Sequence, residues 1–244
     1  MPLFYLRRLT GSQRSDRANR HLARYLACIA GAANAGGFLA VRQYTSHMSG
    51  IVSAMADNLA VGSVSLVFDG LAAVVSFMMG AFLTTLSVRW SRRRHLESIY
   101  AMPLMAEAAL LVAFGLTGEV FHGGYVLSTV LLLCFTMGLQ NAIITKISEA
   151  VIRTTHLTGM VTDIGIVLGR VASRASDTVI SDELQRLRLL GSLIFLFFAG
   201  GVVGALGFKH IGFLFTIPLA AVLVLLAVMP VLDDMMRRPN GVAA

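Results

Sequence analysis

The sequence predicts an all-α integral membrane protein. We expect six transmembrane helices arranged as two inverted three-helix repeats, each with a short re-entrant or broken helix. Composition is the first observation: 56% of the 244 residues are hydrophobic and 14% are charged, and the mean hydropathy is +0.75. A soluble domain of this size cannot keep so much apolar surface from water. The other two observations are a duplicated polar signature and the placement of the basic residues.

Six apolar segments approach the roughly 20 residues that a helix needs to cross a bilayer. They are 25–41, 65–88, 97–117, 124–146, 189–208 and 211–231. Two further stretches, 46–64 and 155–169, are interrupted by polar residues. The interrupting residues are His47, Asp57 and Asn58 in the first stretch, and His156 and Asp163 in the second. We therefore predict that these two stretches are re-entrant or broken helices rather than full crossings.

The basic residues predict the orientation of the chain. We expect residues 1–24 to form a basic cytoplasmic tail, 25–231 a single membrane domain and 232–244 a cytoplasmic C-terminal tail. Six crossings then place every Lys and Arg except Arg42 and Lys209 in the cytoplasm, in line with the positive-inside tendency. The net charge of +7 is explained by these loops, so we expect contact with the lipid bilayer and no nucleic-acid partner.

Four short motifs recur in the same order in residues 25–117 and 124–231. The pairs are Asn34 with Asn141, Ser46-His47-Met48-Ser49-Gly50 with Thr155-His156-Leu157-Thr158-Gly159, Phe77 and Gly80 with Phe197 and Gly200, and Pro103 with Pro218. Each half contains three crossings. An odd number of crossings turns the second copy upside down relative to the first, which is the arrangement of inverted-repeat transporters.

The polar stretch 170–187 separates two segments of the second half. Apolar residues alternate there with Arg, Asp, Glu and Ser. We expect either an interfacial helix on the cytoplasmic side, capped by Ser181, or a solvated loop.

The repeated polar groups are the candidate binding site for a small-molecule solute. Ser46 and Thr155 are good N-cap residues for helices that start at the histidines, and the free N–H groups of a helix start favour an anion. The amides of the preceding crossings add donors and acceptors. The predicted substrate-binding residues are Asn34, Ser46, His47, Ser49, Gly50, Gln140, Asn141, Thr155, His156, Thr158 and Gly159. The alternative is that these groups only bind helices to one another.

Two intramembrane carboxylates are candidates for proton coupling. Glu107 lies inside an apolar crossing, and Asp163 follows His156 by two helical turns, so that both face one side of a helix. A histidine that titrates near neutrality can relay a proton to such an acid. The sequence contains no G-x-S-x-G, H-E-x-x-H, Walker or G-x-G-x-x-G motif. We therefore expect no enzyme activity, no cofactor and no metal site.

A family resemblance rests on two runs of sequence. AGAANAGGFL at 30–39, followed by SHMSG at 46–50, resembles the start of the YoaK family of bacterial membrane proteins. MGLQNA at 137–142, RTTHLTG at 153–159 and TD at 162–163 are similar to the second signature of that family. The resemblance covers about residues 24–231 and implies a small multi-pass protein of the bacterial inner membrane, of unknown function. The family usually has Asp where Asn34 stands, so proton coupling must use other groups here or be absent.

The leading functional prediction is a small secondary transporter or permease with its solute site at the interface between repeats. The alternative is a non-transporting membrane scaffold whose Arg-rich face docks a partner or anionic lipid. A membrane enzyme and a passive channel are the less favoured classes. Small-residue faces such as 200–204 also permit a homo-oligomer.

Overall fold

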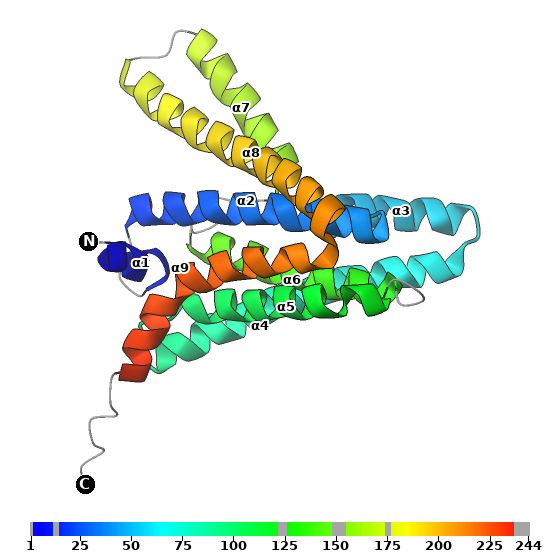
Figure 1. Cartoon of the computed structure of the whole chain (residues 1–244). Coiled ribbons are helices and arrows are strands. Elements are labelled where there is room, and N and C mark those ends of the chain that lie inside the picture. The colour runs from blue at the N-terminus through cyan, green and yellow to red at the C-terminus, as the bar shows by residue number, and fades with distance from the viewer. Residues whose placement is uncertain (1, 12–14, 122–125, 148–154, 174–176, 237–244) are drawn as a thin grey trace.

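The computed structural model describes residues 2–11, 15–121, 126–147, 155–173 and 177–236. Within these ranges the chain is helical apart from short turns (Figure 1), which confirms the all-α class. The helices are α1 (Pro2–Thr10), α2 (Asp16–Val41), α3 (Met48–Ala60), α4 (Val64–Arg93), α5 (Ala101–Phe121), α6 (Val126–Ile147), α7 (Leu157–Ala172), α8 (Asp177–Ile211) and α9 (Thr216–Met236), with a 3-10 turn η1 (Gly212–Phe215) before α9.

Five stretches of the described helices are long and apolar enough to cross a membrane. They are Asp16–Val41, Val64–Arg93, Ala101–Gly118, Val126–Ile147 and Glu183–Met236. The last stretch spans 54 residues and turns back on itself near Gly212, whose φ of 73° glycine adopts readily. Figure 1 shows α8 and α9 as its two limbs. By length and composition the chain is therefore a multi-pass membrane protein.

The two interrupted stretches form the short helices α3 and α7. They contain 13 and 16 residues, or about 20 and 24 Å, which is less than the roughly 30 Å of a bilayer core. Each packs against the long helix that follows it, α3 on α4 and α7 on α8. The hairpins α3–α4 and α7–α8 project from the bundle in different directions (Figure 1).

The bundle is held together by three long helix pairs. α2 packs along α8, α4 along α6, and α5 along α9. A Cβ on Gly31 would overlap the carbonyl oxygen of Phe197, and one on Gly200 would overlap that of Cys28. Glycine therefore lets the backbones of α2 and α8 touch.

The α4–α6 pair makes the same kind of close contact. A Cβ on Gly138 would overlap the carbonyl oxygen of Phe77, and one on Gly80 would overlap that of Phe135. Thr84 also donates its hydroxyl to the carbonyl of Leu139 across this interface, at 3.1 Å.

Helices extend into both segments that were predicted to be tails, 1–24 and 232–244. α2 begins at Asp16, well before the expected start at 25, and Ser15 caps it through a 3.3 Å bond from the Ala18 amide. α1 packs on α9, where Arg7 donates to Asp233 at 2.7 Å. The next acid, Asp234, accepts two backbone N–H groups from the α4–α5 connection. Residues 237–244, with Arg237 and Arg238, lie outside the described residues, as do Arg14, Arg153 and Arg174.

The prediction of a separate interfacial helix or loop at 170–187 is wrong. Its first residues end α7, its last residues belong to α8, and Ser181 lies inside α8 rather than at a cap. Ion pairs between α7 and α8 account for the charged residues that had suggested an interfacial helix or a loop. Arg170 pairs with Glu183 at 2.6 Å, and Arg186 pairs with Asp163 at 2.9 Å. These charged residues thus join α7 to α8 while most of them stay substantially exposed.

Candidate functional site

Two contacts between an asparagine and a hydroxyl, which we call the polar stations, form part of the candidate site. The first polar station is the contact between Asn34 on α2 and Ser46 in the turn that precedes α3. Ser46 donates its hydroxyl to the Asn34 carboxamide oxygen at 3.0 Å. Asn34 is only 8% exposed. The chain turns back toward it because Arg42, the C-cap residue that follows α2, adopts the left-handed conformation, with φ 56°. Stacking of Phe38 on Tyr44, with ring centroids 4.6 Å apart, holds this turn.

The second polar station repeats this arrangement between α6 and the start of α7. Thr155 donates its hydroxyl to the Asn141 carboxamide oxygen at 2.6 Å. The Asn141 amide nitrogen donates to the Met137 carbonyl at 2.9 Å. Asn141 is also 8% exposed. At both stations, then, a hydroxyl just before a short helix binds an asparagine of the preceding long helix.

The predicted N-caps are wrong. α3 and α7 begin at Met48 and Leu157, so His47 and His156 are the N-cap residues, and neither makes a side-chain cap hydrogen bond. The hydroxyls of Ser46 and Thr155 bind asparagine instead. The N-cap side chains of α3 and α7 thus accept none of the first N–H groups of these helices.

The other residues of the repeated motif lie toward the surface. His47 and Ser49 are exposed in the first copy, and His156, Thr158 and Gly159 in the second. Gly50 is partly buried against the imidazole of His47. The structure brings an asparagine and a hydroxyl together in each copy of the motif, whereas both histidines are exposed.

The two stations lie at different levels of the bundle. The Gln140 amide nitrogen reaches the Leu26 carbonyl at 3.5 Å, and Gly37 lies against Leu133, so α2 and α6 run antiparallel. Counting residues from these two contacts separates Asn34 from Asn141 by roughly 10 Å along the helix axes. The two stations are therefore arranged in succession along the helix axes rather than side by side.

Glu107 is fully buried on α5, at 0% exposure. Among the described residues neither of its carboxylate oxygens has a hydrogen-bond partner, nor has the buried Oε1 of Gln140. The two residues are equally far from the facing ends of α5 and α6, so they lie at about the same level of this hairpin. A buried ionised carboxylate needs a cation or several donors. Glu107 is thus a buried acid without any such partner among the described residues.

Asp163, the other predicted proton carrier, has a different environment. It forms its ion pair with Arg186 on α8, and the two side chains are 40% and 51% exposed. A countercharge is therefore already in place, whereas Glu107 has none among the described residues.

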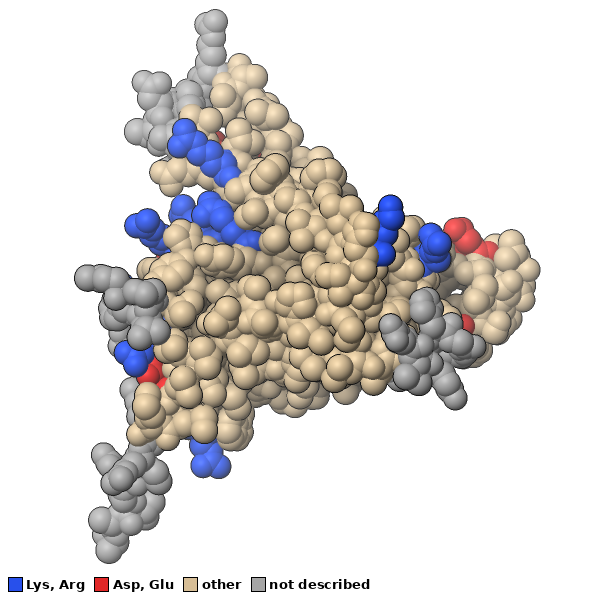
Figure 2. All heavy atoms as spheres, viewed as in Figure 1, with Lys and Arg blue, Asp and Glu red and all other residues tan. Residues whose placement is uncertain are grey.

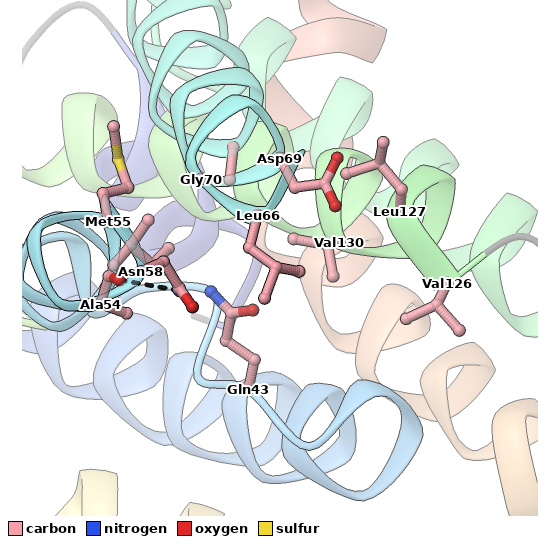
Figure 3. A pocket seen from close by; sticks show the side chains of 12 residues that line it. Gln43, Ala54, Met55, Asn58, Leu66, Asp69, Gly70, Val126, Leu127 and Val130 are labelled. Carbon is pink, nitrogen blue, oxygen red and sulfur yellow. Dashed lines mark hydrogen bonds between the residues drawn. The ribbon is translucent and has the colours of Figure 1, made fainter. Parts of the chain in front are cut away.

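A cavity of about 260 Å³ lies between α3, α4 and the start of α6. None of the predicted site residues lines it. Among the described residues its polar lining is Gln43, Asn58 and Asp69 (Figure 3). Asn58 was visible in the sequence as one of the polar interruptions. Asn58 and Asp69 line one cavity from two helices, which meet at a turn where Gly62 has φ 80°.

Among the described residues, no three His, Cys, Asp or Glu side chains come together as a group. Cys28 and Cys134 are both free thiols.

Comparison with known proteins identifies the family of the chain. No curated protein and no solved structure matches the sequence. A family model described as "Protein of unknown function (DUF1275)" matches residues 22–229, which is most of the chain and includes both polar stations. The chain therefore belongs to the DUF1275 family.

Proposed function

We propose that this protein is a small secondary transporter, or permease, that moves a small solute past the two polar stations. One observation carries the proposal. A buried asparagine binds a hydroxyl in the same way at Asn34–Ser46 and at Asn141–Thr155. Each hydroxyl lies at the entrance to a helix too short to cross the bilayer. Such paired interruptions are typical of transporters with substrate sites between repeats.

The proposal includes two inverted repeats, 25–117 and 124–231. In this alignment of the two halves, α2 corresponds to α6 and α4 corresponds to α8. The α2–α8 pair therefore corresponds to the α6–α4 pair. The Gly31–Phe197 contact likewise corresponds to the Gly138–Phe77 contact. Reciprocal contacts of this kind are expected when a two-fold axis relates two copies. The likeness of the contacts, added to the order of the motifs, supports the duplication.

Six crossings with both termini in the cytoplasm complete the arrangement. α1 and the end of α9 lie at the same end of the bundle (Figure 1), as an even number of crossings requires. Most Lys and Arg side chains visible in Figure 2 gather at that end as well, which is the cytoplasmic end under the positive-inside tendency. The YoaK resemblance supports the bacterial inner membrane as the location.

We further propose that Glu107 is the proton-coupling group and that the solute is a small anion. Glu107 is buried without a partner among the described residues. The uncapped starts of α3 and α7 offer N–H groups and a partial positive charge to an anion.

One observation favours a second function. In each station the hydroxyl and the amide oxygen already satisfy one another. This is also how polar side chains hold membrane helices together. A non-transporting scaffold is therefore the competing proposal.

Transport measurements on the protein in proteoliposomes distinguish the permease from the scaffold. The full chain is reconstituted, and both solute uptake and solid-supported-membrane currents are recorded with a panel of small inorganic anions and organic acids, with and without a proton gradient. We expect uptake or current with at least one solute. The double variant Ser46→Ala plus Thr155→Val removes both station hydroxyls and is expected to abolish that signal.

The matched control is Thr85→Val plus Thr117→Val. Both hydroxyls bind carbonyls of their own helices, at 3.0 and 2.7 Å, so their loss leaves the stations intact. Absence of both uptake and current with every solute, or a full signal in the Ser46/Thr155 variant, contradicts the permease and leaves the scaffold.

A further inference from the structure

We infer that the cavity between α3, α4 and α6 is a binding site for a small amphipathic organic ammonium ion. The site is distinct from the two polar stations, because no station residue lines it. The inference therefore goes beyond the proposed transport function.

The polar lining presents hydrogen-bond acceptors to the cavity. Asp69 is the one charged residue among the described residues that line it, and no salt bridge or hydrogen bond engages it within the described part of the chain. Asn58 donates its amide nitrogen to the Ala54 carbonyl at 2.8 Å, which leaves its carbonyl oxygen as an acceptor. Gln43 reaches the same space from the α2–α3 turn (Figure 3).

These acceptors fit an ammonium group better than a divalent metal ion. An ammonium carries one positive charge and up to three N–H donors, which matches one carboxylate and two amide oxygens. Calcium takes six to eight oxygen ligands, and magnesium requires near-octahedral geometry. One carboxylate with two side-chain amides does not provide such a shell.

The rest of the lining is apolar and bounds the size of the ligand. Ile51, Met55, Leu66 and Val130 line the cavity beside the acceptors. Its volume of about 260 Å³ lies below the roughly 300–1,000 Å³ of pockets that hold drug-sized molecules. The ligand is thus a compact apolar body that carries one ammonium group.

Small residues keep the cavity open. Gly70 and Ala73 line it on α4. When α4 and α8 are aligned so that Phe77 matches Phe197, the residues that match Gly70 and Ala73 are Leu190 and Leu193. These leucines are 6% and 0% exposed. Leucine at the aligned positions therefore provides a substitution that fills the space beside Ala73.

The test is calorimetric titration of the full chain in nanodiscs of uncharged phosphatidylcholine. The probes are benzylammonium, benzoate and benzyl alcohol, which share the ring and differ in charge. We expect saturable binding of benzylammonium alone. Asp69→Asn keeps the shape of the side chain and removes its charge, so benzylammonium should bind at least about tenfold more weakly. Ala73→Leu should remove binding by filling the cavity.

Asp57→Asn is the matched control. Asp57 lies beside Asn58 on α3 but is exposed and does not line the cavity, so the variant should bind as the parent does. The inference is overturned if benzylammonium does not bind, if benzyl alcohol or benzoate binds equally well, or if Asp69→Asn binds unchanged. Because binding is measured without a gradient, a chain that binds but carries no solute refutes only the transport proposal. A chain that transports but does not bind refutes only this inference.

Discussion

Asn34 and Asn141 each accept a hydrogen bond from a hydroxyl that lies outside their own helix. Buried amides are costly in an apolar surrounding unless they are paired. Each asparagine therefore ties the turn before a short helix to a long helix. This local bond positions α3 and α7 relative to α2 and α6, and it is the smallest unit that the two halves share.

A double-mutant cycle measures this bond. Combining Asn141→Leu with Thr155→Val should give a coupling energy of about 0.6–1.7 kcal/mol, the range of interhelical hydrogen bonds in membrane proteins. The cycle for Asn34→Leu and Ser46→Ala should give a similar value. Unfolding in mixed detergent reports the free energies. The crossed pair Asn34→Leu with Thr155→Val should show no coupling, and a large value there would mean that the variants disturb the whole bundle.

The buried carboxyl group of Glu107 is expected to lower the free energy of unfolding. A buried carboxyl without a partner costs more than an apolar side chain of similar volume. Glu107→Leu should therefore raise the free energy of unfolding by about 1 kcal/mol, and it should also abolish proton-driven solute current. A stable variant that retains a proton-driven current would exclude Glu107 as the coupling group.

At the scale of elements, glycine determines which helices pair. Gly31 and Gly200 let α2 meet α8, and Gly80 and Gly138 let α4 meet α6. Close backbone contact replaces the hydrophobic driving force that helices lack inside lipid. The pairs join the first helix of each half to a later helix of the other half.

Gly138→Ala should destabilise the protein by about 1–3 kcal/mol, because the added methyl overlaps the Phe77 backbone. The matched control is Gly191→Ala on α8, where a Cβ meets nothing within 4 Å. That variant should be neutral or up to about 1 kcal/mol more stable through helix propensity. Thermal unfolding in detergent gives both values, and equal effects would show that glycine contacts do not govern the pairing.

Asp234 links α9 to the connection between α4 and α5. Its two oxygens accept the Glu97 and Ser98 amides at 2.8 and 2.9 Å. Asp234→Ala should cost about 1–2 kcal/mol, as the loss of a helix-capping side chain does. The neighbouring Asp233→Asn only weakens a partly exposed pair with Arg7 and should cost less than about 1 kcal/mol. Urea unfolding ranks the two, and the reverse order would contradict the assigned contacts.

At the scale of the whole molecule, charge lies unevenly along the bundle. The ends of α4 and α6 and the start of α2 carry arginine or lysine at the end where α1 packs. The α3–α4 turn lies at the opposite end. Its exposed apolar residues include Val61, at 76% exposure.

Cysteine labelling tests the orientation. In a background that lacks Cys28 and Cys134, Val61→Cys should react with a membrane-impermeant maleimide in intact spheroplasts. Arg94→Cys, at the other end of α4, should react only after lysis. Both follow from the positive-inside tendency. Labelling of position 94 from outside would reverse the topology and remove the support for six crossings with cytoplasmic termini.

Local properties of the sequence were enough to predict the class of this protein. Apolar run length predicted the membrane helices, since hydrocarbon admits only segments that satisfy their own backbone. The two less apolar stretches were recognised because His47 and Asn58, and likewise His156 and Asp163, interrupt them. The motif order also identified Asn34 and Asn141 as a matched pair. Each of these signals lies within one segment and needs no knowledge of its neighbours.

Only the tertiary structure decided which groups meet. Ser46 and Thr155 had the right chemistry to cap a helix, but asparagines on other helices accept their hydroxyls instead. Asp163 gains an ion pair with Arg186, while Glu107 finds none among the described residues. The cavity around Asp69 exists because a turn brings α3 onto α4 beside small residues. Burial and pairing depend on what a neighbouring helix presents, and that neighbour is distant in sequence.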